Sequence, residues 1–158
     1  MSLVLRPATE ADKPALRALL REFMDYLNAI EPGEPVADER IAMLTDLAFG
    51  PDRLVNSLVA ERDGRLVAEL AWTIGIFEVF KALQVVSLFV TASERASGVG
   101  KALMEKAQEL ALEHGAERVW WTVWRQNPKA IAFYETIGGK SFDEEMLMVL
   151  EPRRMGGG

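Results

Sequence analysis

The amino-acid sequence predicts an α/β domain in which helices cover the faces of a mixed sheet. Short apolar segments alternate with longer segments whose apolar residues recur every three or four positions, and glycine or proline marks the junctions between them. The predicted order of elements is β-α-α-β-β-β-α-β-α-β-β. Because strands and helices interleave along the chain, we expect a single sheet layered with helices.

The first third of the chain predicts one strand followed by two helices. Residues 3–8 form a short strand that Pro7 ends. From Asp12 the apolar residues recur at helical spacing, and a second helical stretch covers residues 37–48 after a break rich in proline. The apolar stripe of the first helix consists of Leu16, Leu19, Leu20, Phe23 and Leu27.

The middle of the chain predicts three strands. Residues 56–62 and 65–75 flank an Asp-Gly turn, which is typical of a β-hairpin. Residues 82–90 form a largely apolar strand, and this pattern predicts burial on both faces. We therefore expect the side chains of Val86 and Val90 to pack in the core.

The remainder of the chain predicts two helices and three strands. Residues 99–111 carry one apolar stripe, and residues 117–124 form the next strand. A second helix over residues 127–138 has an asparagine as its N-cap and a glycine at its end. Residues 140–142 and 145–150 are predicted to form the last two strands.

Length and composition are those of a single globular domain spanning residues 1–158, with 49% hydrophobic and 27% charged residues. We find neither an apolar run long enough to cross a bilayer nor a start typical of a secretory signal. A cytoplasmic protein without a membrane partner is therefore expected. The tail "RRMGGG", residues 153–158, is expected to fray.

The residue types that are rare or absent exclude several chemistries. The chain has no cysteine and one histidine, His114, so thiolate nucleophiles, disulfides and the usual metal sites are not expected. A formal net charge of −6 disfavours nucleic acid as a partner. A local basic loop remains able to hold a small anion.

Such a loop follows the apolar strand and leads into a helix. Its glycines either are turn residues or let main-chain N–H groups approach a phosphate at the positive end of the helix. It is not a Walker A loop, because Ala102 replaces the residue that would hold magnesium, and Leu103 replaces the third glycine of a dinucleotide fingerprint. The loop consists of Arg95, Ala96, Ser97, Gly98, Val99, Gly100 and Lys101.

Two motifs together resemble the GNAT superfamily of N-acetyltransferases. They are Arg95-x-x-Gly98-x-Gly100-Lys101 and Asn127-x-x-Ala130-x-x-Phe133-Tyr134-x-x-x-Gly138. The opening "LRPATEAD" and the strand order also match, so the resemblance extends over nearly the whole chain. It implies the GNAT-type acyl-CoA N-acyltransferase fold, with a central mixed sheet flanked by helices, and acetyl-CoA as co-substrate.

The resemblance also implies a role for each part of the site. The loop would wrap the pyrophosphate of acetyl-CoA, the main chain of the preceding strand would pair with the pantetheine arm, and Tyr134 would protonate the departing thiolate. Asn127 fits an N-cap equally, and Tyr134 fits a core tyrosine with a satisfied hydroxyl. The residues assigned to acetyl-CoA are Leu88, Phe89, Val90, Arg95, Ala96, Ser97, Gly98, Val99, Gly100, Lys101, Asn127, Ala130 and Tyr134.

The sequence indicates fewer residues for the acceptor amine and the general base than for acetyl-CoA. Without a cysteine to carry an acyl group, direct attack by an amine in a ternary complex is the simplest chemistry. The chain resembles the polyamine and thialysine acetyltransferases, but Val86 and Ser87 stand where that branch carries acidic residues. Glu69 or Glu78 would then act as the base through a water, although each also fits an exposed glutamate.

Aromatic and acidic residues are candidates for the acceptor pocket and its entrance. Strand alternation predicts Trp120 and Trp124 on one face and Trp121 on the other. The aromatic candidates, which otherwise belong to the core, are Trp72, Phe77, Phe80 and Trp124. The acidic candidates would favour a cationic amine, unless they form an ordinary solvated face, and are Glu22, Asp25, Glu31, Glu34, Asp38 and Glu39.

The leading hypothesis is an N-acetyltransferase that transfers an acetyl group from acetyl-CoA to a primary amine of a small cationic molecule. A protein or peptide N-terminal acetyltransferase and a non-catalytic acyl-CoA-binding module are the alternatives. The expected partner is a small-molecule amine, and the sequence leaves a homodimer open.

Overall fold

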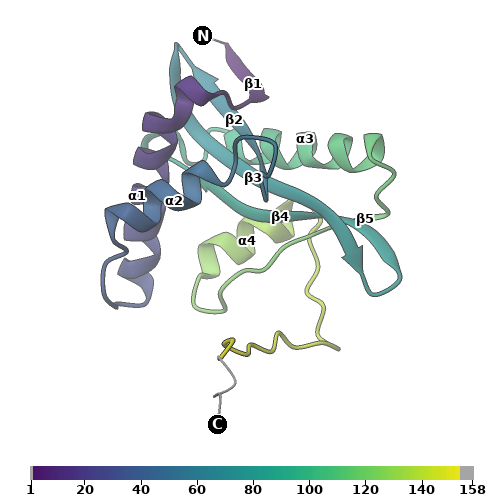
Figure 1. The fold of residues 1–158 in the computed structure, drawn as a ribbon. Coiled ribbons are helices and arrows are strands. Elements are labelled where there is room, and N and C mark those ends of the chain that lie inside the picture. Colours follow the sequence, from purple (N-terminus) through teal and green to yellow (C-terminus); the bar gives the residue numbers. More distant parts are fainter. Residues whose placement is uncertain (1, 154–158) are drawn as a thin grey trace.

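Residues 2–153 are described by the computed structural model, so most of the predicted frayed tail lies outside the described residues. The strands lie in the order β1-β2-β3-β4-β5, the first four antiparallel and β5 parallel to β4, which confirms the mixed sheet (Figure 1). The elements are β1 (Leu3–Pro7), α1 (Lys13–Ile30), α2 (Asp38–Asp46), β2 (Asn56–Arg62), β3 (Arg65–Phe77), β4 (Phe80–Val90), α3 (Val99–Glu113), β5 (Arg118–Trp120) and α4 (Pro128–Thr136), with 3-10 turns at Glu10–Asp12 and Ala92–Glu94.

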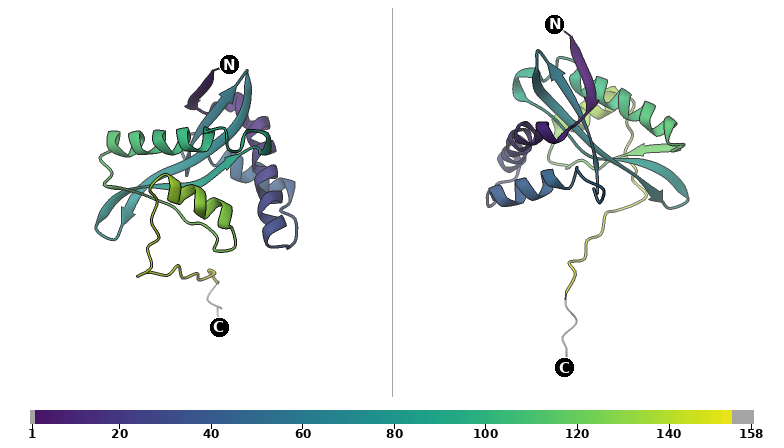
Figure 2. Two further views of the ribbon diagram at one scale, coloured as in Figure 1. Left: turned by 180° about the vertical axis from the view of Figure 1, so that it is seen from behind. Right: turned by 45° about the horizontal axis from the view of Figure 1, so that its top comes forward.

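Helices α1 and α2 cover one face of the sheet, and α3 and α4 cover the other (Figure 2). Leu70 and Leu83 of the sheet and Leu103 of α3 are fully buried in the second interface. Val90 and Phe133 pack against the same core. Since burying a leucine side chain stabilises a fold by about 2 kcal/mol, these contacts give the site a rigid base.

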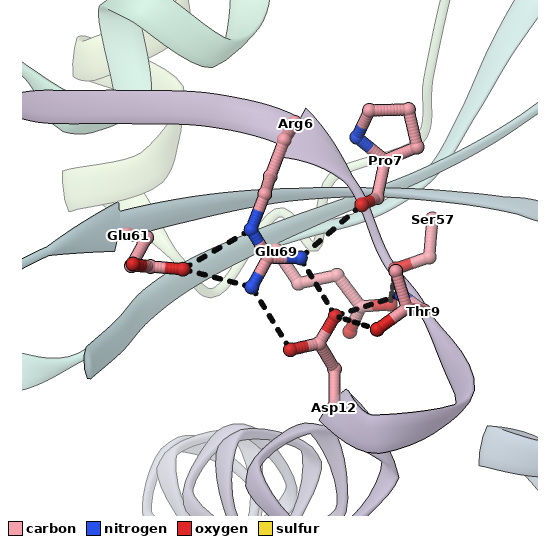
Figure 3. A network of polar contacts seen from close by, with 7 residues as sticks. All are labelled: Arg6, Pro7, Thr9, Asp12, Ser57, Glu61 and Glu69. Carbon is pink, nitrogen blue, oxygen red and sulfur yellow. Dashed lines mark hydrogen bonds and ion pairs between the residues drawn. The ribbon is translucent and has the colours of Figure 1, made fainter. Parts of the chain in front are cut away.

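An arginine ties the start of α1 to the sheet. Arg6 of β1 forms ion pairs of 2.8 Å with Asp12 and with Glu61 of β2 (Figure 3). Asp12 also accepts a hydrogen bond of 2.7 Å from the main-chain N–H of Thr9. The hydrogen bond from Arg6 is the main reason why the pKa of Asp12 falls to about 2. This network therefore holds the first helix in place without belonging to the site described below.

A β-bulge interrupts the pairing of β3 with β4. Ala71 pairs with Ser87, while the next residue, Trp72, pairs with Val85, so Val86 has no partner on β3. A bulge re-aims the side chain of the extra residue. The side chain of Val86 is 48% exposed, and the prediction that it packs in the core is wrong.

Strand β5 is much shorter than the strand predicted over residues 117–124. It pairs only with residues 82–84 of β4, and the chain leaves the sheet after Trp120. Along residues 85–90, no strand in the described part of the chain pairs with this side of β4. The divergence of β5 from β4 leaves main-chain hydrogen-bonding groups free to contact a ligand.

The two strands predicted after α4 do not form in the described residues. Residues 140–142 and 145–150 are irregular, and the apolar side chains of the second segment are 79% to 89% exposed. Glu78 at the tip of the β3–β4 hairpin raises the pKa of Glu145, as expected when two carboxyl groups approach each other. An apolar sequence with high strand propensity forms no strand without a paired edge, and the sequence alone does not show which edge is open.

Candidate active site

A cavity of about 930 Å³ opens where β5 diverges from β4. It is walled by α1, β4, the loop after β4, the segment following β5, and α4. Every residue that the sequence assigned to acetyl-CoA lines it except Ser97 and Val99. Val99 is buried in the core, and the hydroxyl of Ser97 donates to the main-chain oxygen of Glu94 within the loop.

The loop has the geometry of an anion site. Ala96 and Gly98 have positive φ angles of 62° and 87°, and Gly98 is the N-cap of α3. Within residues 2–153, no acceptor is assigned to the main-chain N–H groups of residues 98–101. Free N–H groups at the positive end of a helix suit the oxygens of a diphosphate, so the loop fits the pyrophosphate of acetyl-CoA.

The two glycines of the loop serve different purposes. A side chain on Gly98 would contact nothing within 4 Å, but the positive φ angle disfavours any other residue there. A Cβ on Gly100 would lie 3.2 Å from the ring of Phe133 and 3.7 Å from Val90. Gly100 therefore lets α3 approach α4 closely, a reason that the motif alone did not indicate.

Arg95 is held against two aromatic rings. Its guanidinium lies 4.7 Å from the ring centroid of Tyr26 and 5.5 Å from that of Phe89, and its Nε donates to the main-chain oxygen of Val90 at 3.2 Å. Cation–π contacts of this kind contribute about 0.5–1 kcal/mol at exposed sites and so help to order the charged group. Together with Lys101, which also lines the cavity, Arg95 adds positive charge to the end of the cavity formed by this loop.

Tyr26 also contacts the start of α4, and the sequence analysis missed it. Its hydroxyl donates to Asn127 Oδ1 at 2.9 Å, and the same oxygen accepts a hydrogen bond of 3.3 Å from the N–H of Ala130. Asn127 is therefore an N-cap, as one reading of the sequence proposed, and it lines the cavity as well. Tyr26 follows Leu19 by seven residues and so lies at the edge of the apolar stripe of α1, a spacing that indicates packing but not the polar contact of its hydroxyl.

Tyr134 points into the cavity from an aromatic cluster. Its ring centroid lies 4.9 Å from that of Trp121 and 5.2 Å from that of Phe133. Burial and the nearby Tyr26 raise the pKa of Tyr134 to about 12. Tyr134 therefore stays protonated at neutral pH and can donate a hydrogen bond to an atom that gains negative charge.

Neither glutamate considered as a base lines the cavity. Glu69 is largely buried and accepts a hydrogen bond of 2.7 Å from the hydroxyl of Ser57 (Figure 3). Burial raises the pKa of Glu69, and the hydrogen bond from Ser57 partly opposes that shift. Glu78 is exposed at the tip of the β3–β4 hairpin, with a φ angle of 52°.

Only one of the aromatic candidates for the acceptor pocket reaches the cavity. Trp124 lines it, and so does Trp121, because the alternation of a strand ends with β5. The other three make contacts elsewhere: Trp72 packs on His114, Phe77 stacks on Trp120, and Phe80 lies under Arg118.

None of the acidic residues expected at the acceptor entrance lines the cavity. Glu22 instead accepts hydrogen bonds of 2.8 Å from the hydroxyl of Thr91 and 2.9 Å from the N–H of Ala92. Asp38 accepts a hydrogen bond of 2.6 Å from Arg21. The carboxylates of this segment therefore have mainly structural or surface roles.

Among residues 2–153, no helix has the length and apolar character that a membrane crossing requires. In the same part of the chain, His, Asp and Glu side chains form no group of three or more that could hold a metal ion.

A cavity of this kind suits an enzyme that takes an acyl group from a CoA thioester. The family model described as "Acetyltransferase (GNAT) family" matches residues 16–138, which is most of the chain. The chain belongs to this family of acetyl-CoA-dependent N-acetyltransferases.

Two relatives support the same family. The chain is 24% identical over 152 residues to thialysine N-epsilon-acetyltransferase from Sus scrofa, a match that covers 90% of this chain and 87% of that protein. It is 39% identical over 80 residues to an uncharacterized N-acetyltransferase from Archaeoglobus fulgidus, covering 49% of this chain and 54% of that one.

Solved structures share the fold. An integron cassette protein from V. cholerae matches with a TM-score of 0.81 and 22% identity, covering 96% of this chain and 94% of that one. An aminoglycoside N-acetyltransferase in complex with CoA matches with a TM-score of 0.70 and 18% identity, covering 98% and 95%. These likenesses confirm the predicted fold class.

Proposed function

We propose that this enzyme acetylates the primary amine of a small molecule by direct transfer in a ternary complex. The observation that carries the proposal is that a single cavity joins the loop over residues 95–101, the open edge of β4, and Tyr134. This arrangement leaves room beside the cofactor residues for a second substrate. Since the chain has no cysteine, an acyl-cysteine intermediate is excluded.

Acetyl-CoA supplies an activated acetyl thioester. The main chain of residues 85–90 would hold the pantetheine arm, and the N–H groups of residues 98–101 with Arg95 would hold the pyrophosphate. Tyr134 would donate a hydrogen bond to the departing sulfur. Because the pKa of Tyr134, about 12, exceeds that of a thiol, about 8.5, hydrogen bonding rather than complete proton transfer is the favoured contribution.

The acceptor amine has to lose a proton before it can attack. An amine with a pKa near 10.4 is protonated at pH 7, and deprotonation costs about 4.6 kcal/mol at about 1.4 kcal/mol per pH unit. Neither Glu69 nor Glu78 lines the cavity, so we assign this step to water rather than to either carboxylate. Desolvation of the ammonium group in the cavity would lower its pKa and assist the step.

Release of free thiol from acetyl-CoA in the presence of a panel of small amines tests the proposal, with calorimetric binding of acetyl-CoA measured alongside. We expect both binding and amine-dependent release. Binding without release for any amine or peptide would identify a non-catalytic acyl-CoA-binding module. Release with peptides alone would favour the protein or peptide N-terminal alternative. The cytoplasmic location and a homodimer stay predictions.

A further inference from the structure

Apolar side chains remain in the cavity wall once the residues assigned to acetyl-CoA are set aside. Phe23 and Leu27 come from α1, Val86 from the bulge in β4, and Val123 and Trp124 from the segment after β5. These elements are far apart in the sequence and meet only in the folded chain. The wall is thus built by the tertiary structure and not by one motif.

Three of these side chains are partly exposed in the cavity wall. Val86, Trp124 and Val123 are 48%, 42% and 37% exposed. Apolar surface that lines a cavity is typical of a ligand contact. A bound apolar group would cover the surface that the fold leaves open here.

The charges in the cavity do not favour a polycation. Glu94 is the one carboxylate among the lining residues, and it is ion-paired with Arg62 at 3.0 Å. Arg95, Lys101 and Lys129 are the lining cations. Since Arg95 and Lys101 would face the pyrophosphate, a second ammonium on the acceptor would meet the apolar wall without an unpaired lining carboxylate beside it, and an unpaired charge is costly to bury there.

We infer that the acceptor is a monoamine whose amino group is attached to an apolar body, and that Val86 is a specificity-determining residue for it. This inference rests on the proposed function. It excludes the further cationic groups that the acidic segment would have favoured on the acceptor, because those carboxylates do not line the cavity. Val86 presents a methyl surface at the bulge, which would contact the apolar body of the acceptor.

The test compares hexylamine with hexamethylenediamine, two acceptors of the same length that differ by one terminal ammonium. Thiol release at saturating acetyl-CoA gives kcat/KM for each. We expect the monoamine to exceed the diamine by about tenfold or more in the wild type. Val86→Asp should reverse the order, while Val79→Asp, at an 84% exposed site on the hairpin tip, should leave it unchanged.

The results distinguish a failure of the inferred acceptor class from a failure of the proposed function. An equal or higher kcat/KM for the diamine in the wild type would overturn the acceptor class and leave the proposed function standing. If Val86→Asp and Val79→Asp change the ratio of the two kcat/KM values equally, Val86 does not determine the specificity, and the proposed function still stands. Binding of acetyl-CoA without turnover of any amine would overturn the proposed function itself.

Discussion

The hydroxyl of Tyr26 donates to Asn127 Oδ1 at 2.9 Å, and the ring of Tyr26 lies 4.7 Å from the guanidinium of Arg95. One side chain of α1 therefore contacts both the N-cap of α4 and the loop that suits the pyrophosphate. These two contacts are chemically different, so they can be removed separately. They connect the helix on one face of the sheet with two elements that line the cavity.

Tyr26→Phe and Tyr26→Leu are expected to differ. The phenylalanine variant keeps the ring beside Arg95 but leaves Asn127, which is 7% exposed, without one hydrogen bond, at a cost of about 1 kcal/mol in the free energy of unfolding. The leucine variant also loses the cation–π contact and should bind acetyl-CoA several-fold more weakly. Urea unfolding and calorimetry measure the two effects. Wild-type affinity in the leucine variant would show that Arg95 does not depend on this ring.

Gly98→Ala should weaken acetyl-CoA binding, and Gly64→Ala is its matched control. Both glycines have positive φ angles, 87° and 75°, and neither would bring a new Cβ within 4 Å of another atom. The two substitutions should therefore destabilise the fold similarly, by about 1–2 kcal/mol. Of the two glycines, Gly98 lines the cavity and Gly64 does not. If calorimetry finds the same affinity for both variants, the loop is an ordinary turn.

Tyr134→Phe should lower kcat by about 10² or less and leave acetyl-CoA affinity nearly intact, because in the proposed function it removes a donor to the leaving sulfur and no phosphate contact. Since the pKa of Tyr134 is about 12, the wild-type residue stays protonated from about pH 6 to about pH 9, and the ratio of the two kcat values should be constant there. The measurement requires conditions in which chemistry limits turnover. An unchanged kcat would reduce Tyr134 to a packing residue.

Glu69→Gln should affect stability more than turnover. Burial raises the pKa of Glu69 above 4.5, so the fold favours the protonated form, and wild-type stability should fall as pH rises from about that value through the raised pKa. The glutamine does not titrate, so the variant should gain stability relative to the wild type over the same range. Thermal unfolding at several pH values measures this difference.

The same variant tests the base assignment, with Glu78→Gln as the exposed comparison. Both should retain a kcat near that of the wild type, because neither carboxylate lines the cavity. A loss of several hundredfold in Glu69→Gln, absent in Glu78→Gln and accompanied by loss of the rising limb of the pH profile, would return Glu69 to the role of base.

The parts of the site that the sequence predicted well are those with local signals. The loop over residues 95–101 and the cap at Asn127 depend on glycine, proline and asparagine at fixed offsets, and backbone sterics act within a few residues of those positions. Tyr26 carried no such signal. Its role depends on contacts with residues about 70 and 100 positions further along the chain, which only packing brings near it.

The sequence by itself determined the family, the helices, the first hairpin and the glycine-containing loop at the start of α3. These features depend on periodicity and turn chemistry, which act over short distances along the chain. Tertiary structure decided where strand pairing stops. The early end of β5 opens the cavity, the bulge turns Val86 toward it, and residues 145–150 have no paired edge in the described part of the chain. Pairing and burial depend on which segments meet across the whole chain, and no local pattern encodes that choice.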